Sequence, residues 1–172
     1  MRDGGEMATL PEPAIYVPAM SADARALREA MPAMLLHEGV WEGTYTHIAP
    51  DLAILDRHES RVACIFPTHG PHAYIQRNRF TWPDGRVETA ELPGTFRDGR
   101  LHWDTPTFEG TAWQAADGEI LLHLSRRDEP GTSFREIILL GEGGTHRART
   151  WHWFREGRLI RRTLCEETRT AI

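Results

Sequence analysis

From Val40 to about residue 168, apolar and polar side chains alternate with a period of two, without a helix-length apolar pattern between them. Side chains of a strand point alternately to opposite faces, so this pattern predicts strands over most of the chain. Turn signals at 83–85, 98–99 and 156–157 favour hairpins between antiparallel neighbours. The expected strands lie near 40–48, 52–66, 72–82, 86–92, 94–97, 100–104, 107–115, 119–127, 132–140, 146–154 and 158–168. Roughly ten strands in sequential hairpins predict an all-β, up-and-down antiparallel barrel, with a two-sheet sandwich as the alternative.

One short helix is expected before the strands. Ser21 can cap its start, and Asp23 lies in the first turn, where a carboxylate is favourable. Pro32 ends or kinks the helix, because proline lacks a backbone N–H. The face expected to be buried carries an apolar stripe at helical spacing, formed by Ala24, Leu27, Met31 and Met34.

Length and composition indicate one domain. The chain has 172 residues, of which 40% are hydrophobic and 26% charged, as expected of a globular protein with a core. Residues 1–20 are rich in Pro and Gly without periodicity, which predicts an extended N-terminal arm. Residues 21–172 are then expected to form a single helix-plus-barrel domain.

Charge, hydropathy and cysteine content bear on partners and location. The formal charge is −5 and there is no basic block, which argues against a nucleic-acid partner. No apolar run approaches the roughly 20 residues of a membrane helix, so no membrane partner is expected. The N-terminal segment lacks the apolar core of a secretory signal. Cys64 and Cys165 are expected to be buried thiols of a cytoplasmic protein.

One expected strand carries charged residues on both of its faces. Arg57, Glu59 and Arg61 share one face, and a fully charged triplet belongs in water. Asp56 and His58 share the opposite face with apolar neighbours, and are therefore expected to point toward the interior.

Polar side chains on neighbouring strands are expected to point the same way. Burying each polar group without a hydrogen bond costs roughly 1–3 kcal/mol, so such groups need one another, water or a ligand as partners. A wet or ligand-filled cavity would meet this need, and a self-satisfied polar network at one barrel end is the alternative. The candidates for binding a ligand on these first strands are His47, Ser60, Tyr74, Gln76, Asn78 and Trp82, with Tyr45 beside them.

The later strands are less decisive about their inner faces. Trp103 and His123 are further ligand-binding candidates. In the strand expected at 146–154, Arg149 and Trp151 share one face, and His152 lies on the other. If arginine marks the outside, His152 is inside, whereas if tryptophan marks the inside, Arg149 is inside and could clamp an anion. All three stay candidates, because the pattern does not choose between the two faces.

General acid–base chemistry is the reaction type that the interior residues favour. The pKa of a free histidine is about 6.5, so His58 can act as acid or base near neutrality. Asp56 lies two residues away on the same face and could influence its protonation. Tyr45 could donate a hydrogen bond to a developing oxyanion. These three residues are the catalytic candidates, and removal of a proton with loss of a leaving group would need no cofactor.

Other chemistries have less support in the sequence. The nine histidines lack helical i, i+4 pairs, so no metal site is expected, and a haem- or metal-binding barrel is the third choice. The sequence has no nucleophile-elbow motif for covalent catalysis and no Gly-rich loop that opens a helix for nucleotide binding.

Four segments carry a resemblance to a known fold family: "HEGVWEGTYTHI" at 37–48, "RHESRV" at 57–62, "QRNRFTWPDGRVE" at 76–88 and "RTWHWFREGRL" at 149–159. Over about residues 35–168, the chain resembles a calycin-like (lipocalin-type) family of uncharacterised barrel domains. That family is related in fold to the S-type phycobiliprotein chromophore lyases. The resemblance implies a closed antiparallel barrel with a hydrophobic central cavity, and no residue allows bilin attachment to be carried over.

Two functions of different classes follow. The first is a cofactor-independent lyase, isomerase or dehydratase that acts on a small hydrophobic molecule, aromatic or polyene in character. The second is a noncatalytic carrier of a similar molecule. The oligomeric state stays open between a monomer and a homodimer, although a closed barrel offers no free edge strand through which a dimer could pair.

Overall fold

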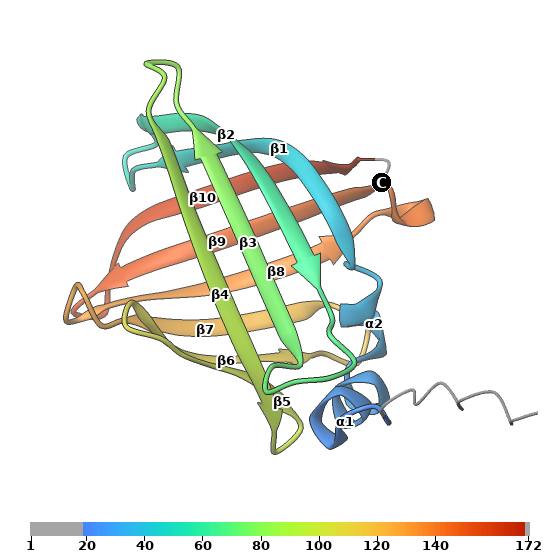
Figure 1. Ribbon diagram of the computed structural model, residues 1–172. Helices are drawn as coiled ribbons and strands as arrows, with labels where there is room; N and C mark the ends of the chain where they lie inside the picture. Colours follow the sequence, from blue (N-terminus) through green and yellow to red (C-terminus); the bar gives the residue numbers. More distant parts are fainter. Residues whose placement is uncertain (1–18, 171–172) are drawn as a thin grey trace, which may run out of the picture.

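A computed structural model describes residues 19–170, and ten strands within this part of the chain form one closed antiparallel barrel (Figure 1). Each strand pairs with its neighbours in sequence, and β1 pairs with β10 to close the barrel. The strands are β1 (Gly39–Ile48), β2 (Ile54–Ile65), β3 (Tyr74–Thr81), β4 (Val87–Arg97), β5 (Arg100–Asp104), β6 (Phe108–Gln114), β7 (Ile120–Arg126), β8 (Thr132–Leu140), β9 (His146–Arg155) and β10 (Arg158–Arg169). The all-β, up-and-down barrel is thereby confirmed, and the sandwich alternative is wrong.

Two short helices precede the barrel, α1 (Ala22–Ala30) and α2 (Pro32–Leu35). The Ser21 hydroxyl caps α1 by accepting a hydrogen bond from the backbone N–H of Ala24, 3.2 Å away. Pro32 opens α2 and so marks the predicted break in the helix. The whole predicted apolar stripe is buried. Among residues 19–170, no helix has both the length and the apolar character needed to cross a membrane.

The predicted N-terminal arm and the predicted domain both extend outside the residues that the structure describes. The arm expected at residues 1–20 lies outside the described residues except for its last two. The single domain expected at 21–172 stays a prediction at its C-terminal limit, since residues 171–172 also lie outside.

β4 is one continuous strand, where the sequence predicted two strands that end and restart at Pro93. The Gly94 carbonyl accepts a hydrogen bond from Ala73, so the backbone groups of Gly94 face β3. The nitrogen of Pro93 then faces the other side, where pairing with β5 begins only at Thr95. The missing N–H of proline therefore removes no hydrogen bond from the sheet, and the strand continues.

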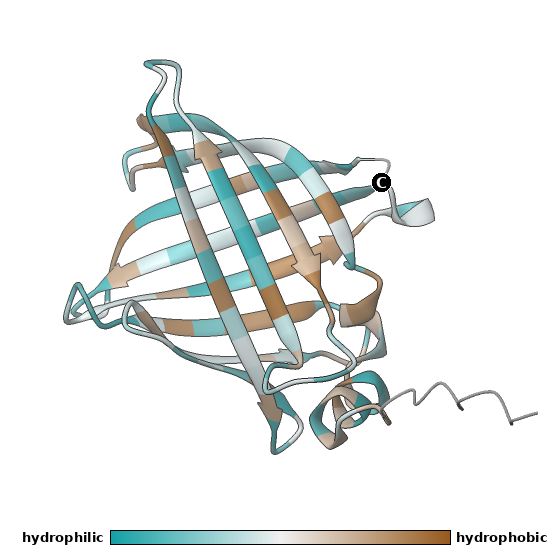
Figure 2. Ribbon diagram, in the orientation of Figure 1, coloured by the Kyte–Doolittle hydropathy of each residue, from teal (hydrophilic) through white to brown (hydrophobic). Residues whose placement is uncertain are grey.

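Hydrophilic and hydrophobic residues succeed one another along the strands (Figure 2), and the buried residues include both kinds. Arg57, Glu59 and Arg61 are exposed on the outer face of β2, as predicted. Gly43 allows the close approach of β1 and β10, because a Cβ at this position would lie 1.9 Å from the backbone oxygen of Glu166. This contact explains the glycine two residues after Trp41 in the first strand.

The helices cover one end of the barrel, which we call the closed end (Figure 1). Its core contains Trp41, which is fully buried and donates a hydrogen bond from its indole nitrogen to the backbone oxygen of His37, 2.9 Å away. Gln114 of β6 fastens α2 by accepting a hydrogen bond from the backbone of Ala33 at 2.7 Å. We call the opposite end, where His47 and Arg161 lie, the open end.

Both cysteines are buried free thiols, as predicted. Cys64 and Cys165 face the interior from β2 and β10. Burial raises the pKa of the Cys165 thiol well above its usual range, so this thiol stays protonated and unreactive.

Candidate functional site

A cavity of about 290 Å³ lies inside the barrel toward the open end. This volume is at the lower limit of the roughly 300–1,000 Å³ typical of small-molecule sites, so it suits a compact molecule. Its aliphatic lining comes from Ala90, Leu92, Leu122 and Leu124. Its aromatic lining, apart from Tyr45, comes from Phe80, Trp82, Trp103, Phe108, Phe134, Trp151 and Trp153. Flat apolar walls with a few polar groups are the usual composition of a ligand site.

Most of the predicted site residues line this cavity. They converge from β1, β2, β3, β5 and β9, and Trp82 follows the end of β3. The predicted residues at the cavity wall are Tyr45, His47, His58, Gln76, Asn78, Trp82, Trp103, Arg149 and Trp151. The inner face of β9 is therefore the face that carries Arg149 and Trp151, which resolves the ambiguity left by the sequence.

Three predicted residues lie inward but away from the cavity wall. Asp56 sits behind His58 and contacts it. Ser60 is buried, and its hydroxyl has no hydrogen-bond partner among the described residues. Tyr74 belongs to the core, where its ring lies 5.0 Å from that of Phe66. These three residues can support the cavity but do not line it.

Two predicted ligand-binding histidines face outward. His123 is exposed, because it alternates with the inward Leu122 and Leu124 along β7. His152 lies opposite Arg135 on the outer face of β9, alternating with the inward Trp151. The prediction that these histidines bind a ligand in the cavity is therefore corrected.

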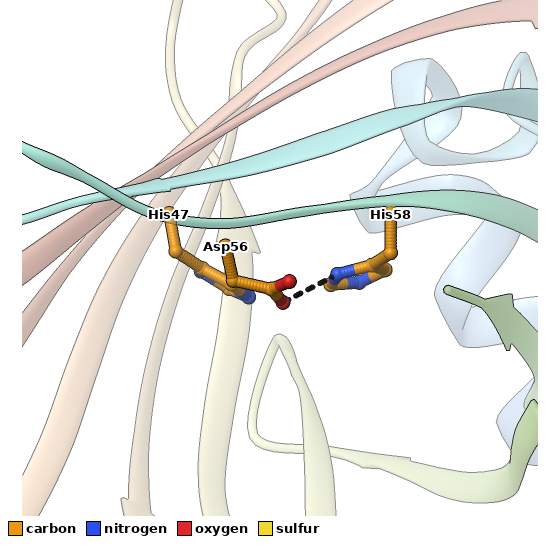
Figure 3. Close-up of side chains that lie close together, drawn as sticks. All are labelled: His47, Asp56 and His58. Atoms are coloured by element: carbon orange, nitrogen blue, oxygen red, sulfur yellow. Dashed lines mark hydrogen bonds and ion pairs between the residues drawn. The ribbon is translucent and has the colours of Figure 1, made fainter. Parts of the chain in front are cut away.

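His58 and Asp56 form a hydrogen-bonded pair at the cavity (Figure 3). Nδ1 of His58 lies 2.9 Å from Oδ2 of Asp56, although neighbouring positions on one strand face are about 7 Å apart along the backbone. The indole N–H of Trp82 also donates to Asp56 at 2.9 Å, and the Trp82 ring packs 4.3 Å from the imidazole. Since Nδ1 is engaged, Nε2 is the ring nitrogen of His58 that is available to a ligand.

The charge of Asp56 is stabilised by these contacts. Burial raises the pKa of this carboxyl group, but the hydrogen bonds from Trp82 and His58 outweigh that effect and leave the pKa below its usual value. A carboxylate that stays ionised fixes the tautomer of the neutral imidazole, with the proton on Nδ1 and a free electron pair on Nε2. His58 is therefore oriented as a proton acceptor.

His47 completes a cluster with Asp56 and His58 (Figure 3). One ligand atom from each residue lies within 4.8 Å of the other two, so the three could hold a divalent metal ion. Nδ1 of His47 contacts the Thr163 hydroxyl at 2.7 Å. Burial, with the charge of Arg161, lowers the pKa of His47 to about 4, so its imidazole is neutral at pH 7. The same positive charge opposes the binding of a cation at this cluster.

A buried ion pair forms the inner wall of the cavity. Nε of Arg149 donates to Glu136 at 2.5 Å, and Nη1 donates to the Tyr45 hydroxyl at 2.8 Å. Burial raises the pKa of Tyr45 well above its usual value, so the hydroxyl keeps its proton. Cys165 lies opposite Tyr45 in the pairing of β1 with β10 and is also buried. The charge of Arg149 is already balanced, so its guanidinium is less available to an anion than the sequence suggested.

A chain of polar side chains runs along the inner face of β3. Tyr74 donates to Gln76 at 2.9 Å, and Gln76 donates to Asn78 at 2.8 Å. The sequence left a cavity and a self-satisfied polar network as alternatives, and the structure contains both. The network holds the amides of Gln76 and Asn78 in place at the cavity wall.

The cavity also contains residues that sequence reasoning missed. Glu136 could have been found, since it lies between the inward apolar residues Phe134 and Ile138 at a spacing of two. Arg161 could have been found in the same way, since it alternates with Thr163 and Cys165 on the inner face of β10. The residues missed are Phe80, Glu88, Ala90, Leu92, Phe108, Leu122, Leu124, Arg126, Phe134, Glu136, Trp153 and Arg161.

Known proteins resemble this chain in fold. No family model and no curated protein matches the sequence. The S-type phycobiliprotein lyase CPES from Guillardia theta matches 88% of this chain and 99% of its own, with a TM-score of 0.67 and 12% sequence identity. The M. tuberculosis protein Rv2717c matches 83% of this chain and 98% of its own, with a TM-score of 0.55 and 16% identity.

A protein of unknown function from the DUF3598 family of Nostoc punctiforme matches 80% of this chain, with a TM-score of 0.62 and 18% identity. The match covers 49% of that protein, so the chain spans about half of its length. These similarities define the class of fold as a calycin-like barrel. More particularly, the barrel is related in fold to the S-type phycobiliprotein lyases, as the sequence resemblance predicted.

Proposed function

We propose that this protein binds a small, flat, largely apolar molecule in the barrel cavity. The observation that carries the proposal is the aromatic lining of a cavity of about 290 Å³ that also contains a few converging polar groups. Aromatic rings pack well against flat ligands, and each favourable ring pair contributes about 0.5–1.5 kcal/mol beyond its buried area. The small volume favours a compact aromatic molecule over an extended polyene.

Filling the cavity from its wall tests the binding proposal. Leu124 is buried and lines the cavity, whereas Leu121 alternates with it and lies on the outer face of β7. We expect 2-naphthamide to bind the wild-type protein in calorimetry. Leu124→Trp should lower its affinity at least tenfold, and the matched Leu121→Trp should change it less than twofold. Absence of wild-type binding, or equal affinity for both variants, would contradict the proposal.

Acid–base catalysis on the bound molecule is a second candidate function, favoured by the hydrogen bond between His58 and Asp56. Nε2 of His58 would accept a proton from carbon, Asp56 would stabilise the resulting imidazolium, and Tyr45 would donate to the developing oxyanion. Return of the proton at another carbon would be isomerisation, and departure of a leaving group would be elimination. The S-type lyase of the same fold supports a catalytic use of such a barrel.

Hydrogen exchange into a small ketone separates the enzyme from the carrier. With 2-indanone in D₂O, we expect the wild-type protein to accelerate deuterium incorporation next to the carbonyl, as followed by NMR. His58→Gln should slow this exchange about 10²-fold or more, the usual contribution of a general base. The matched His123→Gln changes an exposed histidine of the outer face and should leave the rate unchanged. If the ketone binds and His58→Gln exchanges as fast as wild type, the protein is a carrier.

A further inference from the structure

Arg161 faces the interior from β10, in phase with the buried Thr163 and Cys165, and it lines the cavity. Leu159 pairs with Phe154, and the next pair is Arg161 with Trp153, so Ile160 is an extra residue. This bulge lies immediately before Arg161, and the pairing is regular from Arg161 onward. Bulges are frequent beside active sites.

Arg161 differs in its contacts from the other charged residues of the cavity wall. Arg149 is paired with Glu136, as described above. The remaining groups of the wall that form ion pairs are Arg126 with Asp128 and Glu129, Glu88 with Arg86, and His58 with Asp56. Within residues 19–170, Arg161 has no ion-pair partner, although it lines the cavity.

The guanidinium of Arg161 is partly removed from water, and its buried Nε gains no hydrogen bond in return from the part of the chain that the structure describes. Its Nε is buried and has no hydrogen-bond partner among the described residues. Its Cζ lies 4.2 Å above the centre of the Trp153 ring, so one face of the group is covered. A buried donor without a partner costs about 1–3 kcal/mol, and more when the group is charged. A ligand that accepts hydrogen bonds here would remove this cost.

Burial lowers the pKa of Arg161, and charges of both signs surround this group. Glu129 and Asp56 attract the guanidinium from a distance, whereas Arg126 and Arg155 repel it. Glu129 and Asp56 already have their own partners in Arg126, Arg155 and His58. His47 lines the same cavity, and its imidazole is neutral at pH 7.

We propose that Arg161 binds the carboxylate of the cavity ligand, which makes the ligand a small aromatic carboxylic acid; this inference rests on the proposed binding function. A guanidinium matches the geometry of a carboxylate through two parallel hydrogen bonds. Trp153 holds the guanidinium at the cavity wall, and the aromatic body of the ligand would lie among the tryptophan and phenylalanine rings. The carboxylate would then sit close to His47, at the open end.

A pair of ligands that differ in charge and not in shape tests this assignment. We expect wild-type protein to bind 2-naphthoate at least tenfold more tightly than 2-naphthamide in calorimetry at pH 7.5. Arg161→Gln should lower the naphthoate affinity at least tenfold and change the naphthamide affinity less than twofold. The matched Arg158→Gln, at an exposed position of the same strand, should change neither affinity.

The outcomes separate the carboxylate site from the cavity itself. If wild-type protein binds the amide as tightly as the acid, the carboxylate site is wrong and the proposed binding function stands. If neither molecule binds, both proposals are overturned. The wild-type comparison needs no variant, so it decides the question even if Arg161→Gln does not fold. Added salt should weaken naphthoate binding and leave naphthamide binding unchanged, and an equal response of the two would also contradict the assignment.

Discussion

The two ends of the barrel interior contain the same kinds of residue and use them differently. At the closed end, Arg147 lies over the Trp41 ring at 4.5 Å and forms a buried ion pair with Glu167. At the open end, Arg161 lies over the Trp153 ring at 4.2 Å and has no ion-pair partner among the described residues. Both arginines therefore cover a tryptophan ring, but of these two only Arg147 has a carboxylate partner among the described residues.

This difference separates stability from binding within one fold. Arg147 and Glu167 are almost completely buried beneath the helices, so their interaction is inaccessible to a ligand. Asp56 is about one-third exposed to solvent and Arg161 faces the cavity, where a ligand can reach it. We conclude that substitutions at the closed end should act on folding and that substitutions at the open end should act on binding.

The largest expected effect comes from neutralising one carboxylate at each end. Glu167→Gln leaves Arg147 buried without its counter-charge, and we expect the free energy of unfolding to fall by about 3–5 kcal/mol. Asp56→Asn should cost about 1 kcal/mol or less, since its ion pair with His58 is partly exposed to solvent. Urea unfolding of both variants measures the difference, and equal losses would contradict the division between the ends.

Acid should weaken the fold through a histidine at each end. The pKa is lowered to about 3 in His37 and to about 4 in His47, chiefly by burial. Between the ordinary value of about 6.5 and these values, the unfolded chain binds protons that the folded chain does not, so stability falls as the pH falls. By pH 4 we expect each histidine to have contributed a loss on the order of 1–3 kcal/mol, the more buried His37 contributing the larger part.

Measuring the unfolding of variants at pH 7.5 and pH 4 shows which histidine causes the loss of stability in acid. His37→Gln and His47→Gln should each reduce the difference in stability between the two pH values. The exposed His123→Gln is the control and should leave the difference unchanged. Glu167 adds a loss in the same direction below about pH 4.5, because the neighbouring arginines hold its folded pKa below the usual value despite its burial. A wild-type stability that does not fall with pH would refute the prediction.

The smallest change in stability should come from tryptophan substitutions, one on the inner face of the barrel and one on the outer face. Trp82→Phe removes the indole donor to Asp56 and should cost about 1 kcal/mol of stability. It should also weaken 2-naphthamide binding several-fold. Trp113→Phe makes the same change on the outer face, where the ring contacts Arg100, and should leave binding unchanged. Calorimetry and urea unfolding report the two quantities, and equal binding by both variants would show that Trp82 does not contribute to the site.

The fold could be predicted because its main signal is local. Alternation along each strand and short hairpins between neighbours require no knowledge of distant residues, and the exposed triplet Arg57, Glu59 and Arg61 oriented β2 correctly. This orientation placed Asp56 and His58 inside. The continuity of β4 through Pro93 was missed, since it depends on which side of the strand has a neighbour at that point.

The site was less predictable, because its charges are balanced by residues far apart in the sequence. Arginine usually marks a solvated face, yet Arg149 is buried because Glu136 comes to it from β8. Arg161 and Arg162 are neighbours in the sequence, and only the phase of the buried Thr163 and Cys165 shows that Arg161 is the inward one. His123 could have been excluded, since it alternates with leucines on its own strand.

The closing of the sheet by its first and last strands has a consequence for how the protein is made. Trp41 of β1 pairs with Arg169 of β10, so nearly the whole described chain must leave the ribosome before this ladder can form. At ordinary rates of translation, β1 waits on the order of ten seconds for its final neighbour. During that time an unfinished sheet exposes both an unpaired edge and the aromatic residues of the future cavity. The nascent chain is therefore expected to bind chaperones during translation. Faster translation of the segment between β1 and β10 should increase the yield of folded protein.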